Sequence, residues 1–256
     1  MRKEWQYSDT SENEGVIEGR NAVAEALRAG RTIDKVFFLK SDDKMLTRLA
    51  MQAKDRGAVV VNCDRRKLDQ MSRTGVHQGI IAMTAACEYV SVSDMINSAK
   101  ESGRLPLIVV CDEISDPHNL GAIIRSAEAA GANGIIIPKR RNAGLTAVVE
   151  KASAGALEHM PIARVANIPS AIKELKDAGL WVFGTGLYEE SVDLYELDFK
   201  CPAAIVIGSE GEGMGRLVKE SCDFVAKIPM YGKIQSLNAS AAAAVVLFEV
   251  LRQRNA

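Results

Sequence analysis

The sequence is poor in the residues that build disulfide frameworks, metal centres and membrane spans. Its 256 residues include five cysteines and three histidines. The cysteines are odd in number and never form a C-x-x-C pair, which argues against a disulfide framework or a zinc ribbon and favours a reducing cytoplasm. No apolar run reaches the roughly 18 residues of a membrane span. We therefore expect a cytoplasmic protein with no metal site and no membrane contact.

An excess of charge of one sign is also lacking, since the net charge is −1. Its distribution is less even. Residues 15–90 hold 13 basic and 9 acidic side chains, whereas the residues from 91 onward hold 17 and 20. A basic first third indicates a module that faces a polyanion, although a difference of this size also arises by chance.

The first third of the chain alternates short strands with helices. Residues 1–14 are polar and acidic, and we expect them to form a disordered tail. Residues 15–88 are interpreted as a small α/β domain. Its expected elements are a strand or turn and a helix within 16–27, strands at 36–39, 59–62 and 79–85, and helices at 45–54 and 65–71. The polar segment 89–104 is either a helix capped by Ser91 or Ser93 or a linker, and we interpret it as the linker between two domains.

Residues 105–256 alternate apolar runs with helical patterns. The runs are typical of parallel strands that are buried on both faces. They lie at 107–111, 134–137, 181–183, 203–207 and 224–228, with helical patterns at 120–130, 168–178, 214–221 and 237–252. This order predicts a doubly wound α/β domain with a parallel sheet, in which ligands bind beyond the carboxyl ends of the strands. The loops after Cys111, Phe183, Ile207 and Ile228 are therefore the places to look for a site.

The first of these loops leads from Asp112 into a helix that is expected to begin at Leu120. Pro117 restricts the turn, and Asn119 is a candidate N-cap. Arg125 falls outside the expected buried stripe of that helix. Read alone, the loop indicates a capped helix with a solvated arginine.

The second loop, 208–215, holds closely spaced glycines between a buried strand and a helix. Such glycines let backbone N–H groups approach a ligand. Glu210 would repel a phosphate, so the loop suits a ligand that lacks phosphate or carries positive charge.

The third loop, 228–238, precedes an alanine-rich helix. An ordinary core helix capped by Ser236 would explain the alanines. It would not explain why Gln235, Ser236 and Asn238 cluster at the carboxyl end of a strand.

Three groups of residues therefore follow one another along the chain: Asn119 with Arg125, then Gly208-Ser209-Glu210-Gly211, then Ser236-Leu237-Asn238. In order and content they resemble the three motifs of the SpoU (TrmH) family of RNA ribose methyltransferases, in the SPOUT superfamily. The first domain is similar to that family's substrate-binding module, notably at Gly19-Arg20-Asn21-Ala22-Val23 and His77-Gln78-Gly79. The resemblance covers nearly all of the chain after residue 14.

The resemblance implies a fold, a methyl donor and an assembly. The second domain would be a SPOUT domain with a deep trefoil knot, would bind S-adenosyl-L-methionine in the knot, and would form a homodimer. Gly208, Ile228 and Leu237 would contact the adenosine through backbone groups. Thr185 and Gly186 would border the same site, with Ser236 beside them.

The implied reaction is in-line transfer of a methyl group from a sulfonium to a ribose 2′-oxygen. The hydroxyl must lose its proton, or the developing alkoxide must be stabilised. A guanidinium has a pKa above about 12 and rarely deprotonates in proteins. Arg125 is therefore expected to stabilise charge or to orient a phosphate. Asn119 would position Arg125 or the ribose, Glu210 would orient Arg125, and Ser236 and Asn238 would shape the pocket.

Two-domain members of the family commonly modify large-subunit ribosomal RNA, often at a guanosine, and a 23S guanosine is the expected substrate. A small basic domain is suited to recognising a structured loop of RNA. Arg20, Asn21 and His77 are the candidate RNA contacts, although Asn21 is alternatively a helix cap and His77 a turn residue. Transfer RNA, or a ribosomal site whose methylation confers antibiotic resistance, is the alternative substrate.

Two other classes of function are weaker alternatives. A non-catalytic RNA-binding protein of the same fold would show damaged motifs, and no damage is visible. A nicotinamide oxidoreductase would carry G-x-G-x-x-G after the strand at 107–111, and neither that fingerprint nor a P-loop motif is present.

Overall fold

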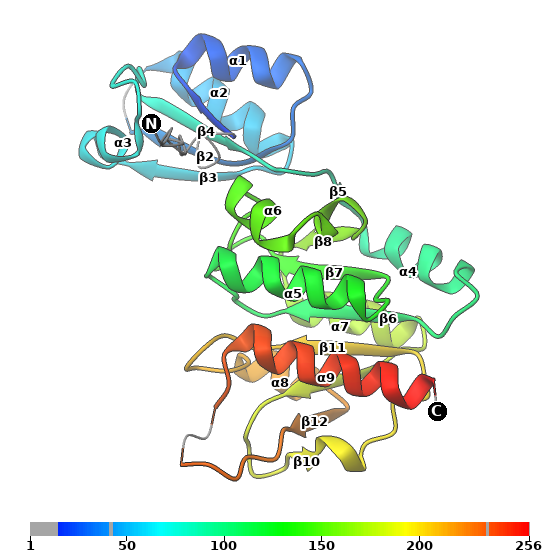
Figure 1. The fold of residues 1–256 in the computed structure, drawn as a ribbon. Helices are drawn as coiled ribbons and strands as arrows, with labels where there is room; N and C mark the ends of the chain where they lie inside the picture. The colour runs from blue at the N-terminus through cyan, green and yellow to red at the C-terminus, as the bar shows by residue number, and fades with distance from the viewer. Residues whose placement is uncertain (1–14, 41–42, 234–235, 256) are drawn as a thin grey trace, which may run out of the picture. The chain divides into compact units, whose positions relative to one another are not determined.

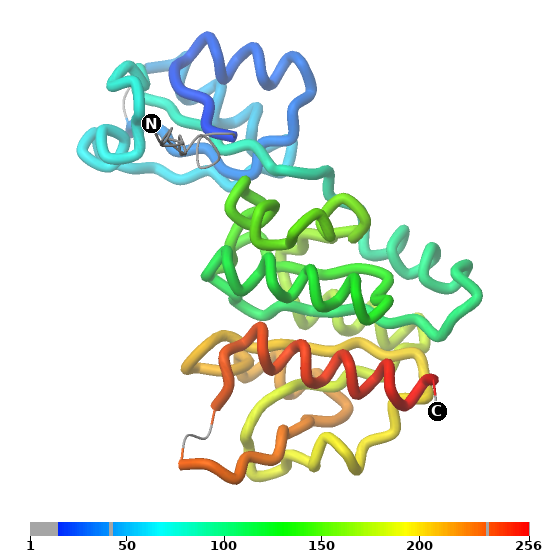
Figure 2. The backbone as a smooth tube through the Cα atoms, viewed as in Figure 1, coloured from blue at the N-terminus to red at the C-terminus, as the bar shows by residue number. Residues whose placement is uncertain are grey.

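A computed structural model describes residues 15–40, 43–233 and 236–255. The chain divides into two compact units, whose ribbons and backbone path are drawn in Figures 1 and 2. Unit 1 comprises the described residues up to Ala86 together with Gly144–Val148. Unit 2 comprises Cys87–Ala143 and the residues from Val149 onward. The expected tail at 1–14 lies outside the described residues, as does Gln235.

Unit 1 is built on a four-stranded mixed sheet in the order β1-β4-β2-β3. β2 and β3 are parallel, and β4 pairs antiparallel with both β1 and β2. The strands are β1 (Val16–Glu18), β2 (Ile33–Leu39), β3 (Val59–Cys63) and β4 (Ile80–Thr84), and the helices are α1 (Arg20–Arg28), α2 (Lys44–Asp55) and α3 (Arg65–Met71). These are the strands and helices expected for residues 15–88, with shifts at their ends.

Side chains alternate along the strands of unit 1, which gives its sheet two apolar faces. Val36 and Ile80 pack with α1 and α2 on one face. Their neighbours Phe37 and Ile81 pack with Leu68 of α3 on the other. The period of two in the sequence therefore decides which helix covers which face.

The loop between α3 and β4 is held to β1 by a single carboxylate. Glu18 accepts hydrogen bonds from the Ser72 hydroxyl at 2.6 Å, the Arg73 backbone N–H at 2.8 Å and the Thr74 hydroxyl at 2.8 Å. Burial raises the pKa of Glu18, but these bonds outweigh it and lower the pKa to about 2. The carboxylate therefore stays ionised at neutral pH and keeps the loop in place.

Unit 2 is built on an eight-stranded sheet in the order β10-β12-β9-β11-β6-β7-β8-β5, and each neighbouring pair is parallel. Its strands are β5 (Tyr89–Val90), β6 (Leu107–Cys111), β7 (Gly134–Pro138), β8 (Ile162–Val165), β9 (Trp181–Thr185), β10 (Val192–Asp193), β11 (Ala203–Ile207) and β12 (Phe224–Lys227). Every residue of β6 and β11 is buried, as expected for central strands covered on both faces.

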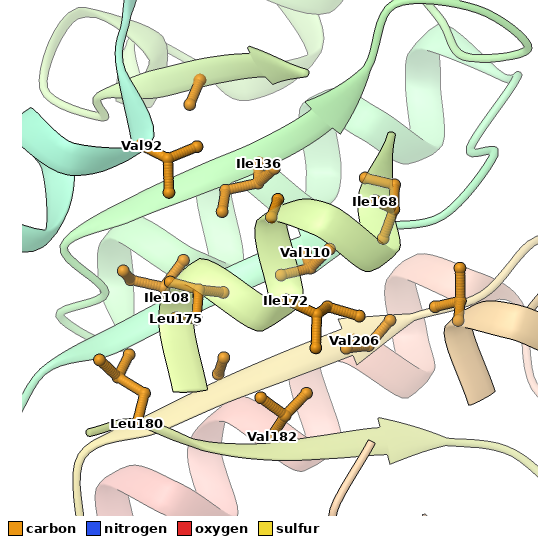
Figure 3. Close-up of a cluster of buried hydrophobic side chains, with 14 of the residues drawn as sticks. Val92, Ile108, Val110, Ile136, Ile168, Ile172, Leu175, Leu180, Val182 and Val206 are labelled. Atoms are coloured by element: carbon orange, nitrogen blue, oxygen red, sulfur yellow. The ribbon is translucent and has the colours of Figure 1, made fainter. Parts of the chain in front are cut away.

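Helices cover both faces of the unit 2 sheet. The helices are α4 (Val92–Glu101), α5 (Pro117–Ala129), α6 (Ala147–Ser153), α7 (Ile168–Asp177), α8 (Arg216–Ser221) and α9 (Ala239–Arg254), with short 3-10 turns at Ala156–Glu158 and Leu194–Glu196. Apolar residues of α4, α7 and α8 pack on the sheet in one cluster, part of which Figure 3 shows. α5 and α9 lie side by side on the other face (Figure 1).

The interpretation of residues 89–104 as a linker is wrong. The segment forms β5, which pairs with β8, and α4, whose Val92, Met95 and Ile96 belong to the core of unit 2. Ser91 caps α4 by accepting a hydrogen bond from Asp94 N–H at 3.0 Å, which is one of the two alternatives that the sequence left open. The many polar residues on the exposed side of α4 made the helical spacing of its apolar residues hard to recognise in the sequence.

The end of α9 is anchored to the segments that precede β6 and β11. The Arg254 guanidinium donates to four backbone carbonyl oxygens, those of Phe199, Leu105, Pro106 and Cys201. Gln253 adds a hydrogen bond to Leu197 O at 2.9 Å. None of the helices in the described ranges combines the length and the apolar character of a membrane span.

Candidate active site

A cavity of about 500 Å³ lies at the carboxyl ends of β9, β11 and β12. That is the edge at which parallel sheets bind ligands, and the volume falls in the usual range of small-molecule sites, about 300–1,000 Å³. The six residues expected to surround the methyl donor all line it: Thr185, Gly186, Gly208, Ile228, Ser236 and Leu237. The structure thus brings together loops that are up to about 50 positions apart in the chain.

Two of the glycines in this wall make room for a side chain of the protein. A Cβ at Gly186 would overlap the ring of Tyr188, and a Cβ at Gly213 would press on the Tyr188 hydroxyl. At Gly208 a Cβ would overlap the returning backbone of Gly213 and Met214. The sequence predicted that these glycines make room for a ligand. In the structure the absent side chains make room for other parts of the protein, and so allow the loops to pack on one another.

Three polar side chains meet at the edge of the cavity, from the first turn of α5, the loop after β11 and the N-cap of α9. Asn119 Nδ2 donates to Glu210 Oε1 at 2.9 Å, and Asn238 Nδ2 donates to the same oxygen at 2.6 Å. Asn238 Nδ2 also donates to Asn119 Oδ1 at 2.9 Å. The backbone N–H of Ala239 reaches Glu210 Oε1 at 3.3 Å. We call Asn119, Glu210 and Asn238 the polar triad.

The polar triad also organises the start of α9. Asn238 Oδ1 accepts hydrogen bonds from the backbone N–H groups of Ser240 and Ala241, so Asn238 is the N-cap of α9. The Glu210 carboxylate therefore lies at the positive end of this helix dipole, where a negative charge is stabilised. Ser236 is exposed at the cavity wall and is not the cap.

Asn119 is also not a helix cap. α5 begins three positions earlier than expected, because Asp116 caps it by accepting a hydrogen bond from His118 N–H at 2.8 Å and Pro117 occupies its first turn. Asn119 therefore lies inside the helix and is 7% exposed. Its side chain is free to join the polar triad.

Arg125 lies apart from the polar triad. It is exposed, and at six residues beyond Asn119 it sits about 9 Å further along α5 and on a different side of the helix. It does not line the cavity, and it makes no hydrogen bond or ion pair with any other residue that the structure describes. The expected contact between Glu210 and Arg125 is not formed in the described structure, where Glu210 binds Asn119 and Asn238 instead, so this role stays a prediction.

The three candidate RNA contacts of unit 1 have different environments. His77 is 5% exposed; its Nδ1 accepts from Gly79 N–H, and its Nε2 therefore donates to Asp69 Oδ1 at 2.9 Å. It is a turn residue, as the alternative held, and its ring is not available to RNA. Arg20 pairs with Asp43 at 2.7 Å and donates to Gln78 O, yet remains partly exposed. Asn21 is exposed.

Two residues of the site were missed. Tyr188 lines the cavity, and its hydroxyl accepts a hydrogen bond from Met214 N–H at 3.1 Å. Asp112 is 5% exposed and accepts from Gly215 N–H at 2.8 Å, which ties the loop after β6 to the loop after β11. A carboxylate directly after a buried strand could have marked Asp112. A single tyrosine in a polar loop carries no comparable signal.

The composition of the cavity wall fits a nucleoside that carries positive charge and no phosphate. Within the described part of the chain, the backbone groups of Gly208, Ile228 and Leu237 make no hydrogen bond to another residue, so they are available to a ligand. Glu210, Glu212 and Lys227 line the same wall, which leaves an excess of negative charge that would attract a cation. Across the ranges that the structure covers, no three His, Cys, Asp or Glu side chains gather as a metal site would require.

Comparison with known proteins decides the family. The SpoU rRNA methylase family matches residues 106–248, more than half of the chain, and the RNA 2′-O ribose methyltransferase substrate-binding family matches residues 16–90. The chain belongs to the SpoU family of RNA methyltransferases. YacO of Bacillus subtilis, assigned to the TrmH family of tRNA/rRNA methyltransferases, is 47% identical to it over 246 residues, 96% of this chain and 98% of YacO.

Solved structures of SpoU enzymes resemble the chain. An AdoMet-bound rRNA methyltransferase from Sinorhizobium meliloti is 28% identical with a TM-score of 0.59, over 93% of this chain and 87% of that one. The TrmH/SpoU tRNA modifying enzyme of A. aeolicus is 30% identical with a TM-score of 0.55, over 64% of this chain and 84% of that one.

The family membership confirms three predictions made from the sequence: the SpoU resemblance, the activity of an RNA 2′-O-methyltransferase, and S-adenosylmethionine as the methyl donor. It also excludes the nicotinamide oxidoreductase. The α/β fold with a parallel sheet agrees with the SPOUT neighbours. The roles of individual residues remain predictions.

Replacing Glu210 by Gln tests the polar triad of this SpoU enzyme. The variant keeps the size of the side chain but removes the charge on which three donors converge, and hydrogen bonds to charged groups contribute about 1.5–3 kcal/mol. We expect the Kd for S-adenosylmethionine to rise about tenfold or more in isothermal titration.

Glu212→Gln is the matched control, because Glu212 lines the same cavity but lies outside the polar triad. We expect its Kd to change by about twofold at most, as for an exposed charge. Equal effects of the two substitutions would show that the charge of the wall matters and the hydrogen-bonded arrangement does not.

Proposed function

We propose that this SpoU enzyme methylates the 2′-hydroxyl of a guanosine in large-subunit ribosomal RNA. One observation carries the proposal: three loops that are distant in sequence share one cavity, with the polar triad at its edge. The guanosine of the large subunit follows from the family resemblance of two-domain members.

Ribosomal RNA is favoured over transfer RNA by the extent of the structural matches. The rRNA methyltransferase from Sinorhizobium meliloti matches 93% of this chain, and so includes unit 1. The A. aeolicus tRNA modifying enzyme and a structure titled for 2-OH methylation of C/U34 on tRNA match only 64% and 60%. Unit 1 is thus a feature shared with the ribosomal enzyme. Transfer RNA stays the second candidate, because the sequence relatives are named for both.

In the proposed reaction S-adenosylmethionine supplies a methyl group bound to a positively charged sulfur. The backbone groups of Gly208, Ile228 and Leu237, which bond to no other described residue, hold the adenosine, and the Glu210 carboxylate favours the positive charge nearby. Thr185 and Gly186 border this site. Because Asn119 and Asn238 are fixed by Glu210, they present a rigid polar edge on which the ribose is oriented.

Arg125 is proposed to act on the RNA rather than on the donor. It is exposed and free of partners among the described residues, so its guanidinium can meet an anionic group that arrives with the substrate. A guanidinium stays protonated, so it stabilises the developing 2′-alkoxide or holds a neighbouring phosphate. The 2′-proton then leaves to solvent or to the RNA itself.

A deep trefoil knot and a homodimer complete the proposal. The knot is supported by the likeness of unit 2 to SPOUT methyltransferases. The dimer is supported by a stripe of apolar residues on α9, where Ala244 and Leu251 are half-buried and Phe248 is 48% exposed. A helix that is apolar on its outer side needs a partner surface. An experimental chain trace in which the C-terminal segment threads through no loop would contradict the knot.

The dimer is tested by Phe248→Glu. A charge in the centre of the apolar stripe is expected to convert a dimer into a monomer at micromolar concentration, as measured by light scattering after size-exclusion chromatography. Trp181→Glu is the control, since Trp181 is also exposed but lies at the start of β9. A monomeric wild-type protein would contradict the dimer outright.

The substrate is tested by mapping 2′-O-methyl groups in RNA from a strain that lacks the protein. We expect one guanosine of 23S rRNA to lose its methyl group, and the purified enzyme to restore it with S-adenosylmethionine. Loss of a mark from transfer RNA alone would replace the ribosomal substrate by the second candidate. Loss from neither RNA would contradict both.

The role of Arg125 is tested by Arg125→Ala. Because the residue lies outside the cavity, the Kd for the donor is expected to stay within about twofold. Loss of charge stabilisation is expected to lower kcat by about 100-fold or more. Arg125→Lys keeps the positive charge but lacks the planar guanidinium that can donate two parallel hydrogen bonds, and it should recover part of the rate. Near-normal turnover by Arg125→Ala would remove it from the mechanism.

A further inference from the structure

Two walls of the cavity come from loops that follow different strands and are not neighbours in the chain. Residues 186–191 follow β9, and residues 208–215 follow β11. Both loops line the cavity, so the distance between them sets its width. Whatever holds the two loops together therefore controls the shape in which the methyl donor is received.

Tyr188 is the side chain that joins the two loops. Its hydroxyl accepts a hydrogen bond from the backbone N–H of Met214 at 3.1 Å. Its ring lies against Gly186, and its hydroxyl lies against Gly213, at positions where any Cβ would collide with it. Gly213 also has a positive φ of 70°, which suits glycine. The absence of side chains at the two glycines therefore makes room for the tyrosine side chain.

The loop that carries Tyr188 is closed by Ser191, which is 8% exposed. Ser191 Oγ accepts from Tyr188 N–H at 2.9 Å and donates to Gly186 O at 3.0 Å. Ser191 N–H donates to Tyr188 O at 3.1 Å. These bonds fix the backbone on both sides of the tyrosine, so the ring enters the wall from a rigid turn.

The outer side of the ring is held from α8. Lys219 Nζ lies 4.8 Å from the ring centroid and pairs with Glu190 at 2.7 Å. A cation over an aromatic face is attractive. The hydrogen bond from Lys219 lowers the pKa of Glu190, and the same bond raises the pKa of Lys219, so both groups stay charged at neutral pH. Tyr188 is thus held by contacts with three segments of unit 2.

We propose that Tyr188 is a positioning residue for the methyl donor, which locks loop 186–191 to loop 208–215 and so forms the cavity before the donor binds. The inference rests on the donor site proposed above. A preformed site binds more tightly because less ordering accompanies binding. Without the hydroxyl, the Met214 N–H loses its partner and the donor must order both loops on arrival.

Tyr188→Phe is the direct test, because it removes only the hydroxyl. We expect the Kd for S-adenosylhomocysteine in isothermal titration, and the KM for S-adenosylmethionine, to rise about 5- to 20-fold. The kcat at saturating donor should stay within about twofold, since Tyr188 touches no reacting group. Lys219→Met, outside the cavity wall, should shift the same two constants in the same direction by a smaller factor.

Tyr195→Phe is the matched control, because Tyr195 is 60% exposed and does not line the cavity. We expect its donor constants to equal those of the wild type. All measurements are made well below the melting temperature of each variant, so a residue that only stabilises the fold would lower Tm and leave Kd and KM unchanged. That result for Tyr188→Phe, or a fall in kcat at an unchanged KM, would overturn the inference.

The experiments distinguish a failure of the proposed RNA substrate from a failure of the inference on Tyr188. A wild-type protein that binds S-adenosylhomocysteine but leaves 23S rRNA unmethylated would overturn the ribosomal substrate, and the titration of Tyr188→Phe would still decide the inference. A wild-type protein that binds no donor analogue would overturn the donor site and the inference together.

Discussion

The site depends on one carboxylate oxygen of Glu210 that joins three segments of unit 2. Glu210 Oε1 accepts from Asn119, Asn238 and the backbone of Ala239, and these contacts join residues that are 91, 28 and 29 positions apart. Each donor alone would be an ordinary polar group. Together they tie the first turn of α5, the loop after β11 and the start of α9 into one edge of the cavity. The same contact places a negative charge where the dipole of α9 favours it.

The order of strands makes this contact possible. β11 lies between β6 and β9, and β12 lies on the other side of β9. In a parallel sheet the carboxyl ends of neighbouring strands share one edge, so the loops after these strands must meet. The complete burial of β6 and β11 fixes their register, and Asp112 then reaches Gly215 across the two strands. The chemistry of the site is therefore built on the loops that follow the central strands.

Sequence patterns were reliable where burial dominates. The strands at 107–111 and 203–207 were predicted with their observed bounds, because a run of apolar residues buried on both faces has clear ends. Three strands were missed: β5 and β10, which have two residues each and lie at the outer ends of the sheet, and the four-residue β8 next to β5. All three are too short to carry a clear apolar signal. The start of α5 was placed three residues late, because the alternative cap Asp116 was overlooked beside Asn119.

The sequence by itself determined the family, the alternation of strands and helices, and the loops in which the site lies, because these follow from local residue types and short periods. Only the tertiary structure decided which side chains meet. It gave Glu210 its partners on α5 and α9, turned His77 into a buried turn residue, left Arg125 exposed away from the cavity, and set Tyr188 between two glycines. Such contacts depend on strand order and register across many residues, and no local pattern encodes a partner that far along the chain.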